Sequence, residues 1–328
     1  MNKKIALYAL TGFLGAGKTT LLTHLLYELG DKKVGIIQNE FGKLGIDGEI
    51  LKSHDNIEMV EINKGSIFCS CLKFNFLSAL IDMSKQDLDC VFIESSGLAD
   101  PSNIGEILTV CKQSAGDVYD FRGVICLVDA LHFDDQIHDI ETVDRQLKHC
   151  NLVVISKLDL VRNTIESTED NLEGHEGTRE HALETLIGKI REVNPVCKIT
   201  TADYGKLDES FLSEDLLLYQ WAESEDTTNS VENKPKTLFL NCHRNVTGEQ
   251  FSAFIEQIKV DCYRLKGFFL IDNAWQQVDV VGNKVDYKPC EAKEYSEIVI
   301  ISKIGPGIIK PIFEIWQTIF GEKPELKN

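Results

Sequence analysis

The residues from Gly12 to Thr20 constrain the fold of this chain more than any other stretch. They read G-F-L-G-A-G-K-T-T, follow the apolar run 5–10 and precede a leucine-rich segment, 19–29, with helical spacing. The pattern G-x-x-x-x-G-K-[ST] between a strand and a helix is typical of a loop that closes around phosphate groups. A glycine-rich turn before an ordinary helix is the alternative, and the flanking strand and helix argue against it.

The chemistry of a nucleoside triphosphate explains the residue types of this loop. Glycines lack Cβ and tolerate positive φ, so backbone N–H groups can approach the anion closely. Lys18 can reach the β- and γ-phosphates, the Thr19 hydroxyl can ligate Mg²⁺, and the positive end of the following helix favours the anion. We therefore expect nucleotide contacts from Gly12, Gly15, Ala16, Gly17, Lys18, Thr19 and Thr20.

An acidic residue ends a second apolar run. The run 90–93 leads into Glu94, and a turn through Gly97 follows. We expect Glu94, which with Lys18 forms the predicted catalytic pair, to act on the Mg²⁺ shell or on the attacking water, and the Gly97 N–H to contact the γ-phosphate. Asp47, in a glycine-rich segment, is a further candidate contact to Mg²⁺ or water, with a solvated turn residue as the alternative.

A third motif indicates which base is bound. The apolar run 152–155 is followed by Ser156, Lys157 and, two residues later, Asp159. One carboxylate can accept both the N1–H and the N2–H₂ of guanine, whereas adenine offers neither donor at that edge. Asp159 therefore predicts selectivity for GTP, with the stem of Lys157 packed over the base. An ordinary surface K-x-D is the alternative, and the preceding strand and the order of the three motifs oppose it.

Two of the ten cysteines, Cys69 and Cys71, have the spacing of metal ligands. If this segment is extended, both thiols project to one face, where they could hold Zn²⁺ or another transition metal with further ligands. Two thiolates are too few for a closed structural zinc site. A pair of half-buried thiols before a helix is an equally open interpretation.

Strand-like and helix-like segments alternate through the first two thirds of the chain, which predicts an α/β domain with a mostly parallel sheet flanked by helices. This P-loop domain is expected to span residues 1–204, and an acidic region and linker residues 205–236. Strand patterns and two helices in 237–328 predict a smaller α+β domain without a nucleotide motif.

Charge and hydropathy narrow the classes of partner. The formal net charge of −18 over 328 residues argues against general nucleic-acid binding, since phosphate backbones attract Lys and Arg. No run of eighteen apolar residues is present, so no membrane span is expected. The sequence enters its first strand directly after Met1-Asn2-Lys3-Lys4, without a signal-peptide pattern, so a cytoplasmic location is expected.

Taken together, these segments resemble the CobW-like family of P-loop GTPases, whose relatives include HypB, UreG and MeaB. The resemblance covers nearly the whole chain, and its second-domain part includes 264–268. It rests on the loop 12–20, Asn39-Glu40-Phe41-Gly42, Ile46-Asp47-Gly48, the run 94–101, Val128-Asp129-Ala130 and Lys157-Leu158-Asp159-Leu160.

The resemblance implies GTP and Mg²⁺ as cofactors and an internal C-x-C-C metal motif. Here the three cysteine positions of that motif are Ser66, Phe68 and Cys69, Cys71 is added, and Gln38 stands where some zinc-binding members carry an acid. Loss of two thiolates should weaken a tetrahedral zinc site by far more than tenfold.

Two functions are consistent with these residues. The first is a Mg²⁺-dependent GTPase, slow on its own, that acts as a metallochaperone or accessory factor for a metal- or corrinoid-dependent client enzyme. The alternative is a GTP-gated protein-binding switch without metal cargo, which the altered cysteine motif favours. A nucleoside kinase-like transferase is a weaker third option, because no second substrate pocket is evident. A homodimer is left open.

Overall fold

The computed structural model describes residues 3–38, 57–62, 73–139, 141–161, 175–204, 206–207, 209–225 and 236–327. The chain divides into two compact units, Met1–Glu232 and Asn233–Asn328, and each is described by itself. Asp47, Cys69 and Cys71 lie outside the described residues, so their roles stay predictions.

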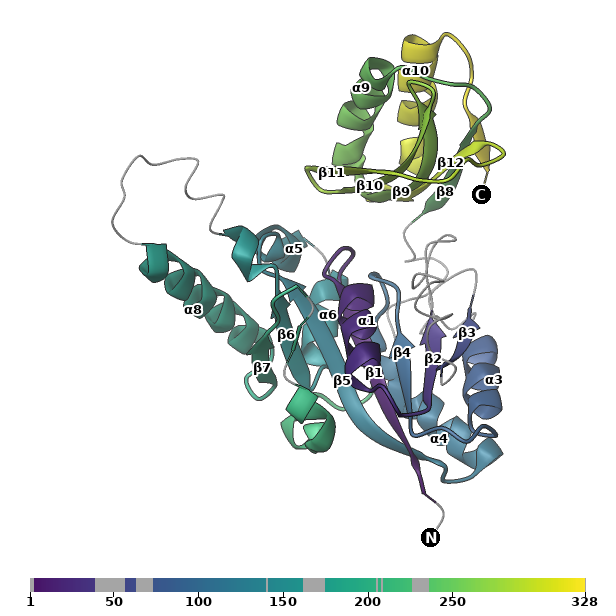
Figure 1. Cartoon of the computed structure of the whole chain (residues 1–328). Coiled ribbons are helices and arrows are strands. Elements are labelled where there is room, and N and C mark those ends of the chain that lie inside the picture. Colours follow the sequence, from purple (N-terminus) through teal and green to yellow (C-terminus); the bar gives the residue numbers. More distant parts are fainter. Residues whose placement is uncertain are drawn as a thin grey trace. The chain divides into compact units, whose positions relative to one another are not determined.

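The first unit contains a seven-stranded sheet in the order β3-β2-β4-β1-β5-β6-β7 (Figure 1). Every neighbouring pair in it is parallel, which confirms the predicted α/β class. The strands are β1 Ile5–Gly12, β2 Val34–Gln38, β3 Ile57–Glu61, β4 Cys90–Glu94, β5 Tyr119–Asp129, β6 Leu152–Ser156 and β7 Lys198–Thr201. The phosphate loop follows β1, which lies at the centre of the sheet.

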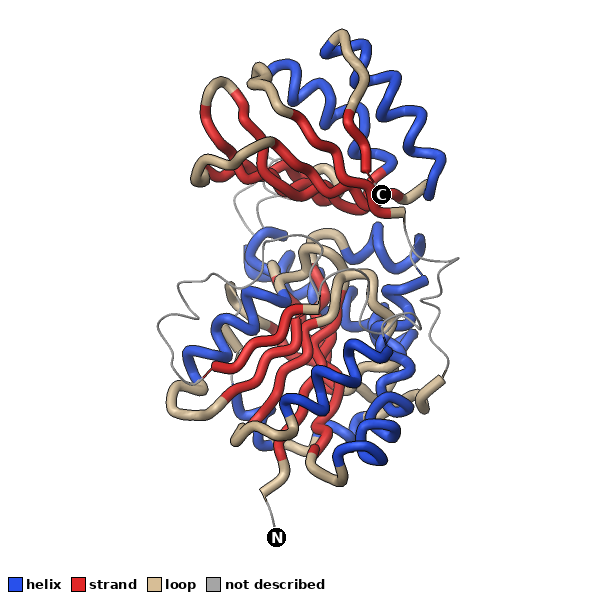
Figure 2. The backbone as a smooth tube through the Cα atoms, turned by 90° about the vertical axis from the view of Figure 1, so that its right-hand side faces the viewer, coloured by secondary structure: helices blue, strands red, loops and turns tan. Residues whose placement is uncertain are grey.

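Helices cover both faces of this sheet, so its inner strands are apolar on both sides (Figures 1 and 2). In the view of Figure 1, α1 lies in front of the sheet and α4 and α6 behind it. The leucines of α1 pack on the face formed by Leu10, Phe92 and Val154. The helices are α1 Lys18–Glu28, α3 Lys73–Met83, α4 Ile104–Ala115, α5 Phe133–Asp139, α6 Glu141–Lys148 and α8 His175–Val193.

The acidic region after β7 contributes to the same core. Two short 3-10 helices, η2 Glu209–Ser213 and η3 Leu216–Tyr219, place Phe211 and Leu216 in the cluster beneath α1. The chain therefore continues to pack on the first unit beyond residue 204. The expected domain limits stay a prediction.

Some local elements differ from the sequence-based expectations. No helix was predicted at the positions of α5 or α6, and the structure places α8 at His175–Val193. Residues 162–174 lie outside the described part of the chain. In α6 only Val143, Gln146 and Leu147 are buried, and two turns are too short for a clear hydrophobic period.

The second unit has an antiparallel sheet in the order β11-β10-β9-β12-β8-β13, with α9 and α10 packed together on one face (Figure 2). Its core is separate and includes Phe254, Phe269 and Trp316. Thr247 and Gln250 form a capping box at the start of α9. The elements are β8 Thr237–Cys242, α9 Gly248–Ile258, β9 Cys262–Ile271, β10 Ala274–Val281, β11 Lys284–Pro289, β12 Ser296–Ser302, α10 Ile309–Phe320 and β13 Glu325–Lys327.

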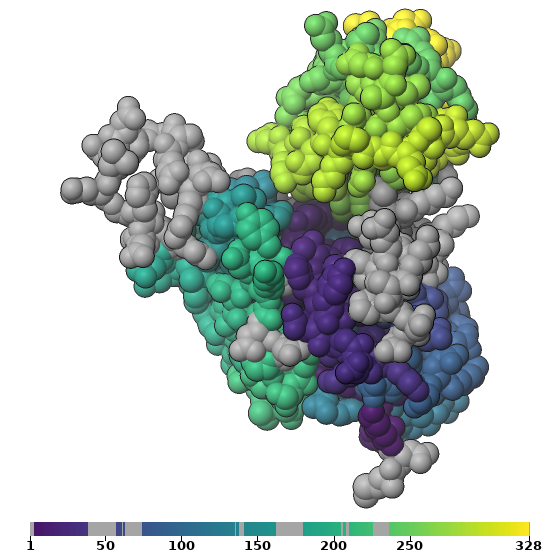
Figure 3. Space-filling view, viewed as in Figure 1, coloured from purple at the N-terminus to yellow at the C-terminus, as the bar shows by residue number. Residues whose placement is uncertain are grey.

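The surface of the first unit reflects its strand order. In Figure 3 the purple surface of β1 and α1 lies between teal and green segments on one side and blue segments on the other.

Among the helices of the described residues, none has the length and apolar character needed to cross a lipid bilayer.

Candidate functional site

The residues singled out in the sequence converge because the strands that carry them are parallel. The carboxyl ends of β1, β4, β5 and β6 meet at one edge of the sheet. The loop 12–17, Glu94, Asp129 and Ser156 occupy those strand ends. Ligands of open α/β sheets bind at this edge, outside the carboxyl ends of the strands.

The phosphate loop is folded around the Lys18 side chain. The Lys18 ammonium donates hydrogen bonds to the carbonyls of Gly12 at 2.6 Å and Phe13 at 3.1 Å. Gly12, Gly15 and Gly17 all have positive φ, between 81° and 131°. A Cβ at Gly12 would also clash with the Leu127 carbonyl oxygen on β5. These glycines are therefore required by backbone conformation and, at Gly12, by close packing.

Gly97 lies directly against the phosphate loop. A Cβ at position 97 would lie 2.5 Å from the backbone nitrogen of Leu14 and 2.7 Å from its Cα. The Ser95 N–H and hydroxyl both reach the Leu10 carbonyl at 3.0 Å, which fixes the start of this segment on β1. The turn after β4 and the loop after β1 thus form one packed unit.

Oxygen atoms gather beside the first turn of α1. The Thr19 hydroxyl donates to Glu94 Oε1 at 2.6 Å, and Gln38 Nε2 donates to Glu94 Oε2 at 2.7 Å. Glu94 is only 2% exposed. Gln38 Oε1 is buried and has no hydrogen-bond partner in the described part of the chain. A hydroxyl, a carboxylate and an amide oxygen are the donor types that Mg²⁺ prefers, so this set fits the ion.

On the other side of the loop, Lys157 is held by an acid that ends β5. Lys157 has φ 59° and donates to Asp129 Oδ2 at 2.6 Å, and His132 Nδ1 lies 3.0 Å from the same oxygen. Burial opposes the charge of Asp129, yet hydrogen bonds with His132 and Lys157 outweigh it and lower the pKa of this carboxyl. The ion pair with Asp129 therefore holds the aliphatic part of the Lys157 side chain in place beside the phosphate loop.

Ser156 connects the predicted guanine segment to the phosphate loop. Its hydroxyl donates to the carbonyl of Ala16 at 2.7 Å and lies 3.1 Å from that of Val128. The side chain is buried, so it supports the site through the phosphate loop. The predicted guanine segment and the predicted phosphate segment are thus hydrogen-bonded directly.

A cavity of about 200 Å³ lies between these two segments. It takes lining from the phosphate loop and α1, from the K-x-D segment and from the chain after β7. Asp159 and Tyr204 both line it, and the Asp159 carboxylate interacts with the Tyr204 hydroxyl. The hydrogen-bonding effect of Asp159, together with its negative charge, raises the pKa of Tyr204. The lining includes Ala16, Gly17, Thr20, Lys157, Asp159, Ala202 and Tyr204.

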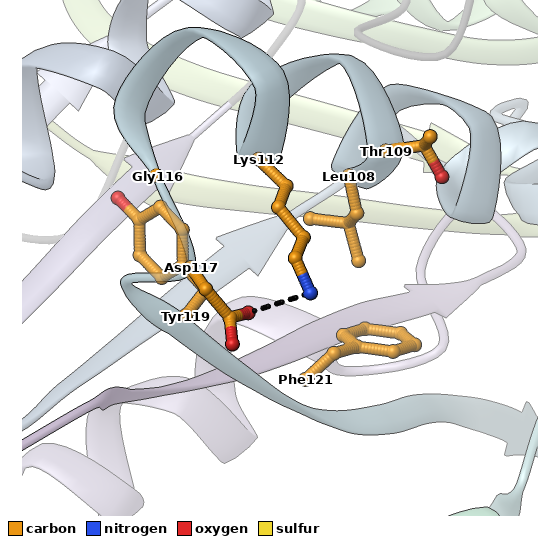
Figure 4. A pocket seen from close by; sticks show the side chains of 7 residues that line it. All are labelled: Leu108, Thr109, Lys112, Gly116, Asp117, Tyr119 and Phe121. Carbon is orange, nitrogen blue, oxygen red and sulfur yellow. Dashed lines mark ion pairs between the residues drawn. The ribbon is translucent and has the colours of Figure 1, made fainter.

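A second cavity, of about 180 Å³, lies between α4 and β5 (Figure 4). Lys112 and Asp117 form an ion pair of 3.1 Å across it, beside the rings of Tyr119 and Phe121. Its cation is already neutralised by a carboxylate, so it lacks the charge that phosphate requires. Among the described residues, no three His, Cys, Asp or Glu side chains are grouped to hold a metal ion.

Side chains of helix α6 hydrogen-bond to the segment that follows Glu94. Gln146 Nε2 donates to the carbonyls of Gly97 at 3.2 Å and Ala99 at 2.9 Å. Arg145 bonds the fully buried Asp100 at 3.1 Å and also Glu225 at 3.1 Å. The phosphate-side segment is therefore braced by a helix that the sequence did not predict.

Sequence reasoning gave no functional role to Asp129 or Tyr204, and treated Gln38 only as a departure from a metal motif. Asp129 had a usable signal, because it ends an apolar strand just as Glu94 does. Tyr204 directly follows the end of the predicted strand that forms β7, and its place beside Asp159 depends on the packing of β7 against β6.

Comparison with known proteins identifies this arrangement. The family model described as "CobW/HypB/UreG, nucleotide-binding domain" matches residues 6–182. The chain belongs to the CobW/HypB/UreG family of P-loop GTPases. The match includes the phosphate loop, Glu94 and the K-x-D segment, and confirms the resemblance.

Two curated relatives show how far the family likeness extends. The chain is 34% identical to the zinc chaperone YjiA of Escherichia coli over 250 residues, which cover 74% of this chain and 69% of YjiA. It is 27% identical to the zinc-regulated GTPase metalloprotein activator 1 of Schizosaccharomyces pombe over 228 residues, covering 67% of this chain and 50% of that protein. The chain thus spans only half of the latter relative's length.

Among solved structures, the zinc-bound YjiA GTPase of Escherichia coli aligns with 97% of this chain and 99% of its own, at 22% identity and a TM-score of 0.46. HypB of Helicobacter pylori in complex with nickel aligns with 68% of this chain and 93% of its own, at 17% identity and a TM-score of 0.43.

Proposed function

We propose that this protein is a Mg²⁺-dependent GTPase that serves as a metallochaperone or accessory factor for a metal- or corrinoid-dependent enzyme. One observation carries the GTPase part. A cavity of about 200 Å³ joins the phosphate loop to Lys157 and Asp159 at the carboxyl edge of a parallel sheet. Its volume suits a purine, and its walls supply a carboxylate for the base and amides for the phosphates.

The phosphate side is expected to act by positioning and charge. Lys18 exchanges its bonds to the Gly12 and Phe13 carbonyls for phosphate oxygens, and the loop amides donate to the same anion. Thr19 and Glu94 would hold Mg²⁺, which supplies charge neutralisation to the phosphates when bound. Glu94, held by Gln38 and Thr19, orients the metal shell or the attacking water.

The base side is expected to select guanine by hydrogen bonding. Asp159 accepts the N1–H and N2–H₂ groups, which adenine lacks at that edge. Lys157 cannot swing freely, because Asp129 holds its ammonium at 2.6 Å. Its methylene stem therefore offers an apolar wall to one face of the base.

The cargo is proposed from the relatives. YjiA is named a zinc chaperone, and zinc or another transition metal is the corresponding substrate here, with Cys69 and Cys71 as candidate ligands. Ser66 and Phe68, which stand at two thiol positions of the family motif, favour the second candidate, a GTP-gated protein-binding switch. A client metalloenzyme or corrinoid protein is the expected partner in the first case.

Base selection can be tested with Asp159→Asn. The variant should lose affinity for GTP roughly 100-fold and gain affinity for xanthosine triphosphate, whose C2 carbonyl accepts from an amide. Isothermal titration with GTP, ATP and xanthosine triphosphate measures the change, and Asp82→Asn on α3 is the matched control. Equal binding of GTP and ATP by the parent protein would contradict guanine selection.

Metal handling needs a separate measurement. Anaerobic zinc titration of the parent, Cys69→Ala and Cys71→Ala should show weaker binding in both variants if these thiols hold the cargo. Equal affinity in all three proteins, or no binding by the parent, favours the GTP-gated switch. Pulldown with a nonhydrolysable GTP analogue, with metal analysis of the captured sample, then separates a metal-loaded client from a metal-free partner.

A further inference from the structure

Tyr204 stands at the mouth of the cavity that we assign to guanine. It lines that cavity together with Ala202, Lys157 and Asp159. Tyr204 is 70% exposed and is one of the large hydrophobic residues that stay exposed in the described part of the chain. The stem of Lys157 forms another part of the same wall. A planar base in this cavity would therefore have the ring of Tyr204 beside it.

The turn that carries Tyr204 is closed by paired backbone hydrogen bonds. Asp203 N–H donates to the Lys206 carbonyl at 3.1 Å, and Lys206 N–H donates back at 2.8 Å. Tyr204 has φ 48°, which lies in the left-handed region that disfavours residues with a Cβ. A bulky aromatic residue thus occupies a backbone position that glycine or asparagine would fill with less strain.

The hydroxyl of Tyr204 has a specific partner. It interacts with the carboxylate of Asp159, which lines the same cavity and is the group proposed to read the guanine edge. A carboxylate has about four acceptor positions, so it can accept from a hydroxyl and from both guanine donors together. Contact with the hydroxyl therefore leaves the carboxylate enough acceptor positions for the base.

We infer that Tyr204 is a nucleobase-binding residue, whose ring packs on the purine and whose hydroxyl positions Asp159 for guanine. The inference rests on the proposed guanine selectivity of the cavity. The ring contributes to binding of any purine, since every base presents a π-face. The hydroxyl contributes to guanine preference alone, because it acts through the carboxylate.

Two variants separate the ring from the hydroxyl. Tyr204→Phe keeps the ring, so GDP affinity should fall only about twofold to fivefold, with ATP affinity unchanged. Tyr204→Ala removes both, so GDP affinity should fall roughly tenfold or more. Both variants should fold, because Tyr204 is largely exposed. Alanine, like tyrosine, has a Cβ, so the substitution leaves the backbone strain at this position nearly unchanged. Titration calorimetry measures each Kd, and Tyr27→Ala, an exposed tyrosine on α1, is the matched control.

Inorganic tripolyphosphate distinguishes base binding from a general effect on the loop. Its affinity should be the same for the parent, Tyr204→Phe and Tyr204→Ala, because it has no base. Unchanged GDP affinity in Tyr204→Ala, or an equal loss for GDP and tripolyphosphate, would overturn the inference. Asp159→Asn, measured beside these variants, tests the proposed function independently. If it alters base preference while Tyr204→Ala does not, only the role of Tyr204 fails.

Discussion

Glu94 is the residue on which the proposed chemistry of the site depends most. It ends a fully buried strand and is bonded through both oxygens, to Thr19 and to Gln38. A buried carboxylate with both oxygens engaged cannot rotate, so its direction toward the phosphate side is fixed. That rigidity is what an acid needs to orient either a metal shell or a water molecule.

Replacing Glu94 by Gln should separate binding from chemistry. The amide is isosteric but uncharged, so GTP hydrolysis should slow roughly 100-fold while GDP affinity changes little. Single-turnover hydrolysis and GDP titration give the two values. Glu184→Gln, at an exposed position on α8, should behave like the parent. A Glu94→Gln protein that hydrolyses GTP at the parent rate would remove Glu94 from the mechanism.

His149 gives the stability of the first unit a defined pH dependence. The His149 side chain is only 4% exposed. The charged groups near it belong to Arg145, Lys148, Glu225 and Asp100. Burial lowers its pKa, and the hydrogen bond to Glu225 opposes this only in part.

The folded protein therefore takes up a proton on His149 less readily than the unfolded chain. As pH falls below about 6.5, the unfolded state gains protons first, so the free energy of unfolding should decrease until the folded pKa is reached. Urea unfolding at pH 7.5 and 5.5 measures this loss. His149→Gln should lose less stability over the same interval, and an equal or larger loss would contradict the prediction.

At the scale of elements, the contact between the turn after β4 and the phosphate loop is a closely packed part of the site. Gly97 leaves no room for a Cβ against the backbone of Leu14, and Gln146 of α6 holds the Gly97 carbonyl. Motion of the turn must therefore involve the loop, and motion of the loop must involve the turn.

Gly97→Ala should disturb both elements together. Because the obstructing atoms are backbone, we expect a loss of about 1–3 kcal/mol in stability and at least a tenfold loss of GTP affinity. Gly188→Ala is a matched control in α8, where an added Cβ meets nothing within 4 Å. That variant should gain roughly 0.5–1 kcal/mol through helix propensity and keep its GTP affinity. Unaltered GTP binding in Gly97→Ala would contradict the tight packing.

The parts of the fold that sequence predicted are those with local signals. The runs around Leu10, Ile93 and Ile155 are buried on both faces, so composition alone marks them as inner strands. The edge strand β11 has no such signal, because its residues are mostly exposed and polar. The site divides in the same way. Lys18 and Asp159 are named by motif, whereas the pairing of Lys157 with Asp129 requires β5 and β6 to be neighbours.

At the scale of the whole molecule, the two units have separate hydrophobic cores. One contains the leucines of α1 and the strands of the parallel sheet, and the other contains Phe254, Phe269 and Trp316. Nucleotide contacts are proposed only in the first. The chain thus combines a core beside the proposed nucleotide site with one that has no assigned ligand.

Calorimetry should resolve this difference as two unfolding transitions. GDP at about 100 times its Kd stabilises the state that binds it by about 2.7 kcal/mol, which for a unit of this size raises Tm by roughly 5–10 °C. Only one transition should move. A single transition that shifts as a whole would show that the two cores unfold cooperatively.

The separate core of the second unit has a practical consequence for every variant discussed above. The melting temperature of the second unit can serve as an internal reference within the same molecule. A substitution that lowers the melting temperature of both transitions indicates damage to the preparation or to the whole chain. A substitution in the first unit that shifts only the transition of that unit has a local effect. Each sample would therefore contain its own reference, and small ligand-induced shifts could be compared between preparations without a second protein.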